Sequence, residues 1–467
     1  MSFTSLGFLI FLPCILLLHW LLPHRFRYLA LLAGSYFFYG YLNPWLLPLL
    51  LSTTLVSYLC SLGMEKYQKR RKLLLFLGIF FVLGLLFTFK YLDFTFSLFV
   101  LAGLNLSFYP LNLVLPVGIS FYTFQTLAYM IDVFKGKTTA ERHIGYYALF
   151  VSFFPQLVAG PIEKSQRLLP QLKAKRTLDL DGFGIGLRYV AIGFIKKVVI
   201  ADFFAVYVNS VYSGIASFSG FEILLATFLF GLVIYGDFSG YSDIALGVAK
   251  WLGVDLTKNF DRPYLSSSLK EFWNRWHITL NDFFTEYVYI PLGGSRKGRF
   301  RKYLNIMIVF LLSGLWHGAS LHFLLWGVAH GILLVLEDLL SPLWEKIKMP
   351  KTFKMCLSIF FTFIVVNLLW VFFRAQTIGD SFLAFQRIFT AFASIFDLSF
   401  FSVLRIVYAI LVVVALILLP YLPRLEKGNQ RSFSYLGLYA ALFIIVGLCY
   451  FNNLSSGGES SFIYFAF

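Results

Sequence analysis

The segment "SGLWHGAS", residues 313–320, places a histidine between two apolar runs, 306–312 and 323–329. An ionisable side chain at membrane depth costs about 2.5–3.5 kcal/mol or more at the centre of a helix, so it marks a functional site by default. A neutral imidazole can take a proton from a hydroxyl group. We therefore interpret His317 as a candidate general base. The alternative is a histidine that is simply hydrogen-bonded in the core.

A second histidine lies in "LKEFWNRWHITLNDFFTEYVYIPLGG", residues 269–294. At about 100° per residue, this stretch predicts one amphipathic helix along an interface or a cavity wall. One face is apolar and the other is charged. The apolar face collects Trp273, Trp276, His277, Leu280 and Phe284, and the charged face carries Glu271, Arg275, Asp282 and Glu286. His277 and Asn281 are neighbours on the flank of the apolar face, so we expect this pair to point into protein.

The stretch "YGDFSGYSD", residues 235–243, is a third polar cluster in membrane surroundings. Its carboxylates could bind a cation or relay protons, and they could equally hydrogen-bond helix N-termini and orient a neighbouring histidine. We favour the structural role for Asp237 and Asp243. With Tyr241, they are kept as candidate substrate contacts.

Other catalytic motifs are missing from the sequence. It has no glycine-rich phosphate loop, no H-E-x-x-H and no G-x-S-x-G in a suitable setting, which disfavours ATP hydrolysis, metalloprotease and esterase chemistry. The 4 cysteines are far apart and lack metal-ligand spacing. We predict neither a metal site nor a permanently bound cofactor.

The elements that must position these residues belong to a membrane protein. Of the 467 residues, 59% are hydrophobic, 20% aromatic and only 13% charged, unlike a soluble domain. A helix needs ~20 apolar residues to cross a bilayer. The stretches that reach or approach this length are 3–22, 73–89, 220–235, 355–373, 403–419 and 436–451. With shorter, polar-interrupted segments, we expect an all-α integral membrane fold of about eleven or twelve membrane-embedded helices.

The net charge of +16 is concentrated in a few loops. Loops rich in Lys and Arg stay in the cytosol, so we place 65–72, 163–176 and 295–302 there. Segments 93–112 and 203–222 carry neither residue and are placed outside. A nucleic-acid-binding stripe is disfavoured because no soluble domain is present to display one.

The chain shows no internal repeat and no long linker, so residues 1–467 are interpreted as a single membrane domain. Its first span lacks the flanks of a signal peptide and is expected to be retained. Polar residues interrupt the apolar runs throughout 112–331. Such interruptions are tolerated at membrane depth only where the backbone is buried in protein or lines a wet cavity, so we expect the catalytic core there.

The segment "YYALFVSFFPQLVAGP", residues 146–161, is apolar but contains Pro155 and ends in Gly160-Pro161. Basic residues flank it on both sides, and both flanks favour the cytosol. We therefore predict a broken, re-entrant hairpin rather than a span.

Several blocks of the sequence resemble the membrane-bound O-acyltransferase family, in particular the bacterial branch that includes the alginate O-acetylase membrane subunit. They are "GISFYTFQTLAYMIDVFKG" (118–136), "FFPQLVAGPI" (153–162), "DFSGYSDIALGVAKWLG" (237–253), "NFDRPY" (259–264), "FWNRWHITL" with "YVYIPLGGSR" (272–296), "LSGLWHGAS" (312–320) and "SFIYFAF" (461–467). Their order and spacing cover nearly the whole chain. Thr279 and Asn281 stand where related chains often have serine, and Gly236 stands where an aromatic residue is common, which leaves the acceptor open.

The resemblance implies a membrane enzyme with a funnel from each side and a narrow neck at His317, and with His277 as the family's second histidine. It also implies acetyl-CoA as the donor and an acceptor outside the cytoplasmic membrane. Arg296 and Lys297, in the basic loop, could attract the phosphates of coenzyme A, although membrane orientation alone explains that loop equally well. His277 and Asn281 would then position the thioester carbonyl or the pantetheine arm.

The geometry expected of this site follows from the same residues. His317 should lie between an inner cavity that reaches the basic loop and an outer cavity. Trp316 should pack beside its ring. Gly314 and Gly318 should permit close approach of backbone or substrate.

We therefore expect an O-acetyltransferase of the bacterial cytoplasmic membrane that modifies an extracytoplasmic polysaccharide such as alginate. It would act among membrane lipids with a secreted or periplasmic acetyl-carrying transferase, and without nucleic acid. Peptidoglycan or teichoic acid is an alternative acceptor, with D-alanine as the acyl group in the latter case. A secondary transporter and a non-catalytic secretion scaffold are the competing classes; the absence of two similar halves disfavours the transporter.

Overall fold

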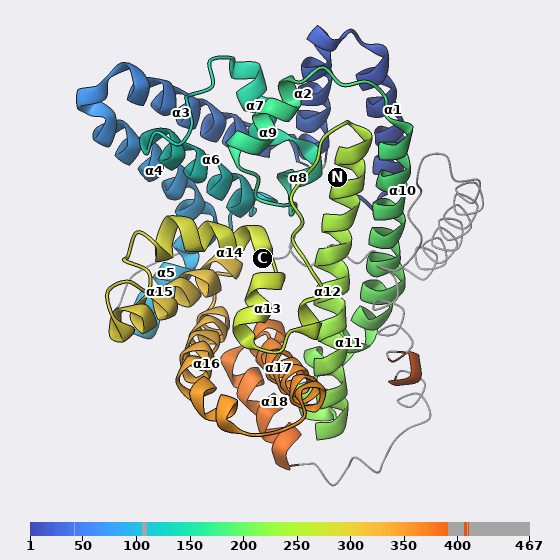
Figure 1. Ribbon diagram of the computed structural model, residues 1–467, viewed down its shortest axis with the longest axis vertical. Helices are drawn as coiled ribbons and strands as arrows, with labels where there is room; N and C mark the ends of the chain where they lie inside the picture. Colours follow the sequence, from blue (N-terminus) through green and yellow to red (C-terminus); the bar gives the residue numbers. More distant parts are fainter. Residues whose placement is uncertain (42, 105–109, 391–405, 409, 411–467) are drawn as a thin grey trace.

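The computed structural model describes residues 1–41, 43–104, 110–390, 406–408 and 410 (Figure 1). In this part of the chain the fold consists of α-helices joined by short 3₁₀ and π turns. Its one β-type pairing is an isolated bridge between Phe260 and Trp276. The all-α prediction is therefore confirmed.

The helices fall into an amino-terminal group, a central group and a carboxyl-terminal group along the chain. The first group is α1 (Leu6–Leu21), α2 (His24–Gly40), α3 (Leu47–Lys66), α4 (Arg71–Leu86), α5 (Leu92–Leu101), α6 (Ile119–Phe134), α7 (Ile144–Ser152), α8 (Phe154–Leu157) and α9 (Ser165–Lys173). The second is α10 (Leu180–Phe194), α11 (Phe203–Ser213), α12 (Gly220–Trp251), α13 (Leu269–Arg275) and α14 (Ile278–Phe284). The third is α15 (Arg299–His317), α16 (Leu321–Lys346), α17 (Lys351–Arg374) and α18 (Ile378–Thr390).

Within the described residues, 5 helical segments are long and apolar enough to cross a membrane: Pro44–Lys66, Gln68–Leu101, Gly220–Trp251, Leu321–Lys346 and Lys351–Arg374. They include three of the predicted spans, and the predicted first span is the shorter apolar helix α1. The predicted spans at 403–419 and 436–451 lie outside the described residues, apart from 406–408 and 410. The chain is thus a multi-pass membrane protein, and the expected total of helices stays a prediction.

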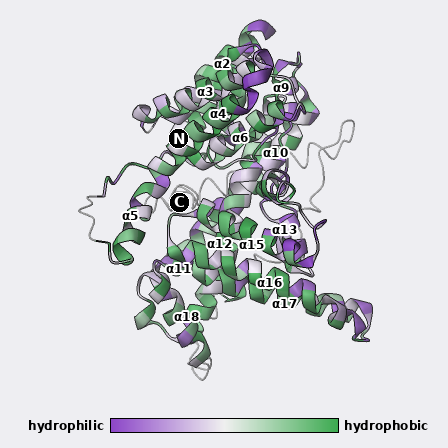
Figure 2. Ribbon diagram, turned by 90° about the vertical axis from the view of Figure 1, so that its left-hand side faces the viewer, coloured by the Kyte–Doolittle hydropathy of each residue, from purple (hydrophilic) through white to green (hydrophobic). Residues whose placement is uncertain are grey.

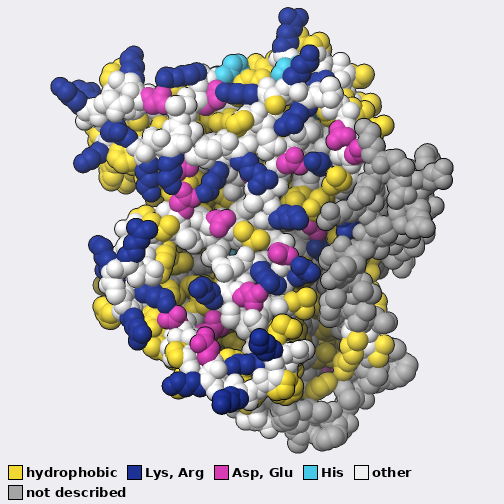
Figure 3. All heavy atoms as spheres, in the orientation of Figure 1, with side chains coloured by type: hydrophobic (Ala, Val, Ile, Leu, Met, Phe, Trp, Pro, Cys, Tyr) yellow, Lys and Arg dark blue, Asp and Glu magenta, His cyan; other side chains and the backbone are white. Residues whose placement is uncertain are grey.

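Hydrophilic residues gather on one side of the fold, near α9 and α13, while α5 lies at the opposite edge (Figure 2). The face seen in Figure 3 carries many Lys and Arg side chains mixed with some Asp and Glu. Ion pairs connect loops that the sequence assigns to the cytosol. Glu286 binds both Lys137 and Lys164. The basic flanks on both sides of residues 146–161 are therefore held together by one carboxylate, as expected of flanks on the same side of the membrane.

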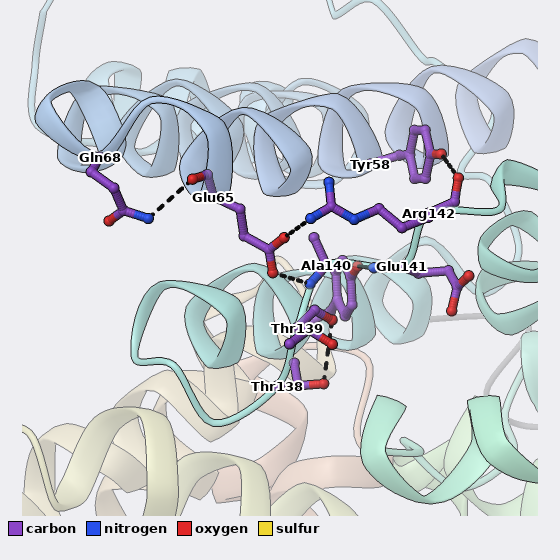
Figure 4. Close-up of polar contacts among 9 residues, drawn as sticks. Tyr58, Glu65, Gln68, Thr138, Thr139, Ala140, Glu141 and Arg142 are labelled. Atoms are coloured by element: carbon purple, nitrogen blue, oxygen red, sulfur yellow. Dashed lines mark hydrogen bonds and ion pairs between the residues drawn. The ribbon is translucent and has the colours of Figure 1, made fainter.

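Glu65, at the carboxyl-terminal end of α3, ties the loop after α6 to this face (Figure 4). Its carboxylate accepts hydrogen bonds from the Arg142 guanidinium, at 2.6 Å, and from the backbone N–H of Ala140. The Tyr58 hydroxyl, two turns earlier on α3, donates to the carbonyl oxygen of Arg142 at 2.6 Å. Two side chains of one helix thus fix the path of a basic loop.

The segment predicted to be broken is indeed broken. Helix α7 ends at Ser152, and the short α8 begins at Phe154 with Pro155 in its first turn. At about 1.5 Å per residue, neither piece can cross a ~30 Å hydrocarbon core. Residues 147–163 are buried inside the protein. Buried irregular backbone of this kind is what membrane depth permits.

Helices α15 and α16 pack closely enough that glycine is required at their contact. A Cβ atom on Gly314 would lie 2.4 Å from the carbonyl oxygen of Phe323, and one on Gly327 would lie 2.2 Å from that of Phe310. A Cβ atom on Gly318 would lie 2.2 Å from the Phe323 ring. These glycines therefore allow α15 and α16 to pack closely. Close approach of backbone is one of the roles expected for Gly314 and Gly318.

Replacing Gly314 by Ala should lower the stability of the fold by about 1–3 kcal/mol, because the new methyl group meets backbone that cannot rotate away. Gly84→Ala is the matched control, since a Cβ atom at this helical glycine meets nothing within 4 Å. Thermal unfolding in detergent should show a lower midpoint for Gly314→Ala than for Gly84→Ala. Equal midpoints would show that α15 and α16 can move apart without lowering the stability of the fold.

Candidate active site

His317 is the last residue of α15, and its side chain is 3% exposed. Its ring makes edge-to-face contacts with Trp316, Trp326 and Phe373, with ring centroids 4.9, 5.1 and 5.3 Å apart. Trp326 lies on α16 and Phe373 on α17. Three helices therefore fix the imidazole in an aromatic environment that keeps water away from most of its surface.

His277 lies at a break between two short helices, which corrects the prediction of one continuous amphipathic helix over 269–294. Helix α13 ends at Arg275 and α14 begins at Ile278. His277 itself has φ 45° and ψ 54°, a left-handed conformation in which Asn, Asp and His are enriched among non-glycine residues. The periodicity of the apolar residues missed this break because apolar residues continue on both sides of it.

The break is stabilised by hydrogen bonds from another part of the chain. The backbone N–H of Ile278 donates to the carbonyl oxygen of Asn259 at 2.9 Å. The Thr279 hydroxyl donates to Oδ1 of Asn259 at 2.7 Å and accepts from the backbone N–H of Ile162 at 3.0 Å. Thr279 thus joins three segments beside His277, so the hydroxyl at this position has a structural role.

Trp316 lies between the two histidines. Its ring is 5.7 Å from the ring of His277 and 4.9 Å from that of His317, measured between centroids. Phe121 of α6 contacts both Trp316, at 5.2 Å, and His277, at 6.1 Å. The expectation that Trp316 packs beside His317 is met. The two candidate catalytic histidines, far apart in sequence, are brought together across one indole ring.

Asn281 is one turn after His277, and its backbone N–H donates to the carbonyl oxygen of His277 at 3.1 Å. Its side chain is only partly buried, whereas that of His277 is 1% exposed. The two residues are neighbours as predicted, but only His277 is enclosed. A role for Asn281 in binding substrate stays a prediction.

A narrow cavity of about 20 Å³ reaches His317, room for about one water molecule. It lies where the carboxyl-terminal end of α15, the amino-terminal end of α6 and the π turn Phe87–Tyr91 meet. Its lining consists of Lys90, Pro116, Gly118, Ile119, Ser120, Phe121, Trp316 and His317. A second cavity, joining His317 to the basic loop, stays a prediction.

Lys90 is a polar residue that lines this cavity, and it was not predicted from the sequence. Its Nζ donates to the carbonyl oxygen of Trp316 at 2.6 Å and to Oγ of Ser120 at 3.3 Å. The neighbouring Tyr91 hydroxyl donates to the carbonyl oxygen of Leu315 at 2.9 Å. The signal was present in the sequence, because Lys90 and Asp93 are the two charged residues inside the long apolar run 73–101, and charges at membrane depth mark functional sites.

The cluster Asp237, Tyr241 and Asp243 lies on α12, where both carboxylates form ion pairs. Asp237 binds Lys197 at 2.6 Å, and Asp243 binds Lys196 at 2.6 Å. Both lysines belong to the π turn Ile195–Asp202, which follows α10. Tyr241 is 1% exposed and stacks on Phe3 at 4.5 Å. The geometry favours the structural role, and substrate contact by these three residues stays a prediction.

These ion pairs act on the site through one aromatic residue. Phe238, next to Asp237, contacts the ring of His277 edge-to-face at 4.7 Å. The pairs fix α12 against the turn 195–202, so they also fix the position of Phe238. The aspartates were expected to be able to orient a neighbouring histidine, and the structure offers this indirect route through Phe238.

Arg296 and Lys297 lie in the exposed turn before α15, on the basic side of the molecule. Earlier in the chain, Glu286 bridges Lys137 and Lys164. Burial alone would raise the pKa of the Glu286 carboxyl, but the hydrogen bonds from these two lysines outweigh burial and lower its pKa. Glu286 therefore stays ionised and holds the loops, while Arg296 and Lys297 stay exposed to solvent.

The fold and the site together define a multi-pass membrane protein in which a buried histidine reaches a cavity at the end of a helix, as expected of a membrane-embedded transferase. The model of the membrane-bound O-acyltransferase family matches residues 35–376. The chain therefore belongs to the membrane-bound O-acyltransferase family, and it is an O-acyltransferase.

Curated relatives support this assignment over most of the chain. A protein of Pseudomonas putida named probable alginate O-acetylase AlgI is 38% identical over 387 residues, which is 81% of this chain and 78% of the relative. The peptidoglycan O-acetyltransferase of Helicobacter pylori is 37% identical over 386 residues, 76% of this chain and 72% of the relative. The teichoic acid D-alanyltransferase of Streptococcus thermophilus is 29% identical over 239 residues, 48% of this chain and 56% of the relative.

Asp237→Ala should reduce the yield of folded protein, because it removes one partner of the buried Lys197. Breaking a buried pair costs about 3–5 kcal/mol, and the second partner of Lys197, Asp202 at 2.9 Å, should keep the cost at the lower end. The double variant Lys197→Met with Asp237→Leu is the control and should recover part of the yield. A folded, fully stable Asp237→Ala protein that lacks activity would instead support substrate contact.

His277→Asn should fold better than His277→Val, because asparagine tolerates the left-handed backbone and valine does not. Both variants lose the imidazole, so both should use the acyl donor less well. Size-exclusion profiles and donor consumption measured on the same preparations separate the two effects. Full donor consumption by His277→Asn would remove His277 from the site.

Proposed function

We propose that this chain transfers acetyl groups from cytosolic acetyl-CoA toward hydroxyl groups of an extracytoplasmic polysaccharide of the alginate type, in the bacterial cytoplasmic membrane. The observation that carries the proposal is the position of His317, buried at the end of α15 and open to a cavity, in a chain that belongs to an O-acyltransferase family. Acetyl as the acyl group is supported by the names of the relatives that match most of the chain.

The depth of His317 in the membrane supports a site that the donor reaches from the cytosol and the acceptor reaches from outside. Helix α15 has 19 residues, about 28 Å at 1.5 Å per residue, close to the thickness of a hydrocarbon core. It starts beside the basic loop, which the positive-inside rule places in the cytosol. The His317 end thus lies toward the outer side, where the lining residues Pro116 and Gly118 follow a segment that carries no Lys or Arg.

Acyl transfer at this position needs one base and one enclosed path. The imidazole of His317 takes the proton of the acceptor hydroxyl as its oxygen attacks the thioester carbonyl carbon. A new C–O bond forms, the C–S bond breaks, and the proton passes to the departing thiolate. The aromatic residues around His317 exclude water, which would otherwise compete with the acceptor for the acyl group.

The donor would approach from the basic face. Arg296 and Lys297 are exposed there and can attract the phosphates of coenzyme A before the acyl arm enters the protein. His277 and Trp316 contact one another, and Trp316 contacts His317, so they would guide the thioester to the base. A secreted or periplasmic acetyl-carrying transferase would receive the group outside and pass it to the polysaccharide.

A second acceptor, peptidoglycan, has a specific observation in its favour. The relative from Helicobacter pylori, named a peptidoglycan O-acetyltransferase, is nearly as similar to this chain as the alginate relatives are. The chemistry at His317 is the same for both acceptors. Only the partner outside the membrane would differ.

His317→Ala should lower acetyl transfer by about 10²–10⁴-fold, the usual contribution of a positioned general base. His143→Ala is the matched control, because His143 is exposed and does not line the cavity. O-acetyl groups released by mild alkali should be counted separately on exopolysaccharide and on peptidoglycan, at equal amounts of protein in the membrane. Normal acetylation by His317→Ala would contradict the proposal.

The same experiment tests the acceptor and the donor. Loss of O-acetyl groups from exopolysaccharide alone supports the first acceptor, and loss from peptidoglycan alone supports the second. Membranes supplied with radiolabelled acetyl-CoA should transfer label only when His317 is present. Transfer of label from a D-alanyl carrier, with no transfer from acetyl-CoA, would show that the acyl group is D-alanine and would contradict acetyl transfer.

A further inference from the structure

We propose that Lys90 is a second catalytic residue, whose ammonium group stabilises the negative charge that develops on the carbonyl oxygen of the acyl group while His317 acts as base. This rests on the proposed acyl transfer and assigns a role within the same site. Lys90 and His317 line one cavity, so a carbonyl placed between them can reach both groups.

The position of Lys90 is set by an unusual turn. Residues Phe87–Tyr91 form a π turn between α4 and α5, a feature found frequently at functional sites. The consecutive residues Lys90 and Tyr91 both reach the end of α15, where they bind the consecutive carbonyl oxygens of Trp316 and Leu315. The ammonium group is therefore fixed one residue away from His317.

The hydrogen bonds of Lys90 leave capacity for a ligand. An ammonium group has three N–H donors, and the described partners, Trp316 and Ser120, use two of them. Both partners are uncharged, and among the described residues no carboxylate forms an ion pair with Lys90. The side chain is also only partly buried. Its charge is thus available to an anion in the cavity.

Electrostatics at the end of α15 require a cation if an oxyanion is to form here. The last carbonyl groups of a helix carry partial negative charge, and the carbonyls of Leu315 and Trp316 border the cavity. A developing oxyanion would be repelled by them. Among the described residues that line the cavity, Lys90 is the one Lys or Arg, and its Nζ donates to the carbonyl oxygen of Trp316.

The charge balance of the step is complete. The acceptor oxygen attacks as His317 takes its proton, and the carbonyl π electrons move to the oxygen, which becomes an oxyanion beside Lys90. The oxyanion then collapses, the C–S bond breaks, and the thiolate takes the proton from His317. Lys90 keeps its protons throughout, as expected of a group that acts through charge and hydrogen bonding.

The alternative role for Lys90 is a helix cap that stabilises α15 without touching substrate. Tyr91→Phe is the matched control, because it removes a hydrogen bond to the same helix end from a residue that does not line the cavity. Lys90→Met removes the charge and keeps the length of the side chain. Lys90→Arg keeps the charge.

The kcat and the KM for acetyl-CoA should be measured for these variants and the wild type, in membranes that contain equal amounts of protein. We expect Lys90→Met to lower kcat by about 10²–10³-fold, as loss of an oxyanion-stabilising donor does, with little change in KM. Lys90→Arg should recover part of kcat, and Tyr91→Phe should stay close to the wild type. Equal and small losses for Lys90→Met and Tyr91→Phe would leave Lys90 as a cap only.

A binding measurement keeps the proposal testable if Lys90→Met fails to fold. The wild type should bind a ketone analogue of acetyl-CoA more tightly than a thioether analogue that lacks the carbonyl, and Lys90→Gln should remove that preference. A preference that persists in Lys90→Gln would overturn the role of Lys90. A wild type that neither binds nor consumes acetyl-CoA would overturn the proposed function itself, and this inference with it.

Discussion

A helix that ends inside a membrane leaves its last carbonyl oxygens without water and without a following turn. Helix α15 meets this constraint at His317, and residues from a distant segment resolve it. Lys90 and Tyr91 supply the missing donors to Trp316 and Leu315. Because the helix can end there, the imidazole lies at the helix end beside a cavity rather than on a helix side. Lys90 also donates to Ser120 of α6, so the turn after α4 and the start of α6 both meet the end of α15 at this junction.

The same constraint shapes the second histidine. The chain breaks at His277, and the backbone N–H groups of Ile278 and Thr279 just after the break donate to Asn259. Each histidine therefore lies where regular helix stops and where other segments supply the hydrogen bonds. Trp316 joins the two breaks by contacting both rings. The site is thus built from two interrupted helices that share one aromatic residue, an arrangement that a membrane tolerates only inside protein.

The sequence predicted the class of fold well, because apolar length is a strong signal in a membrane protein, whereas the catalytic role of the two histidines stays a prediction. The sequence predicted poorly where helices stop. The apolar face of 269–294 continues through His277, so periodicity indicated one helix, while the hydrogen bonds that favour the break come from Asn259 and Ile162. Lys90 was missed for a different reason. Its charge within an apolar run was visible, but the group that it binds belongs to α15, more than 200 residues later in the chain.

Lys90, Lys196 and Lys197 show how hydrogen-bond partners decide what the charge of a lysine can do. Lys196 and Lys197 are bound by carboxylates, so their charges are neutralised locally and act to hold α12 against the turn before α11. Lys90 is bound by a carbonyl and a hydroxyl oxygen, which satisfy its donors without cancelling its charge. At low dielectric an uncancelled charge exerts its field over a longer range and with greater energy than in water. Lysine therefore holds helices together where its partners are carboxylates, and it polarises a cavity where its partners are uncharged oxygens. The difference lies in the acceptors that the fold provides.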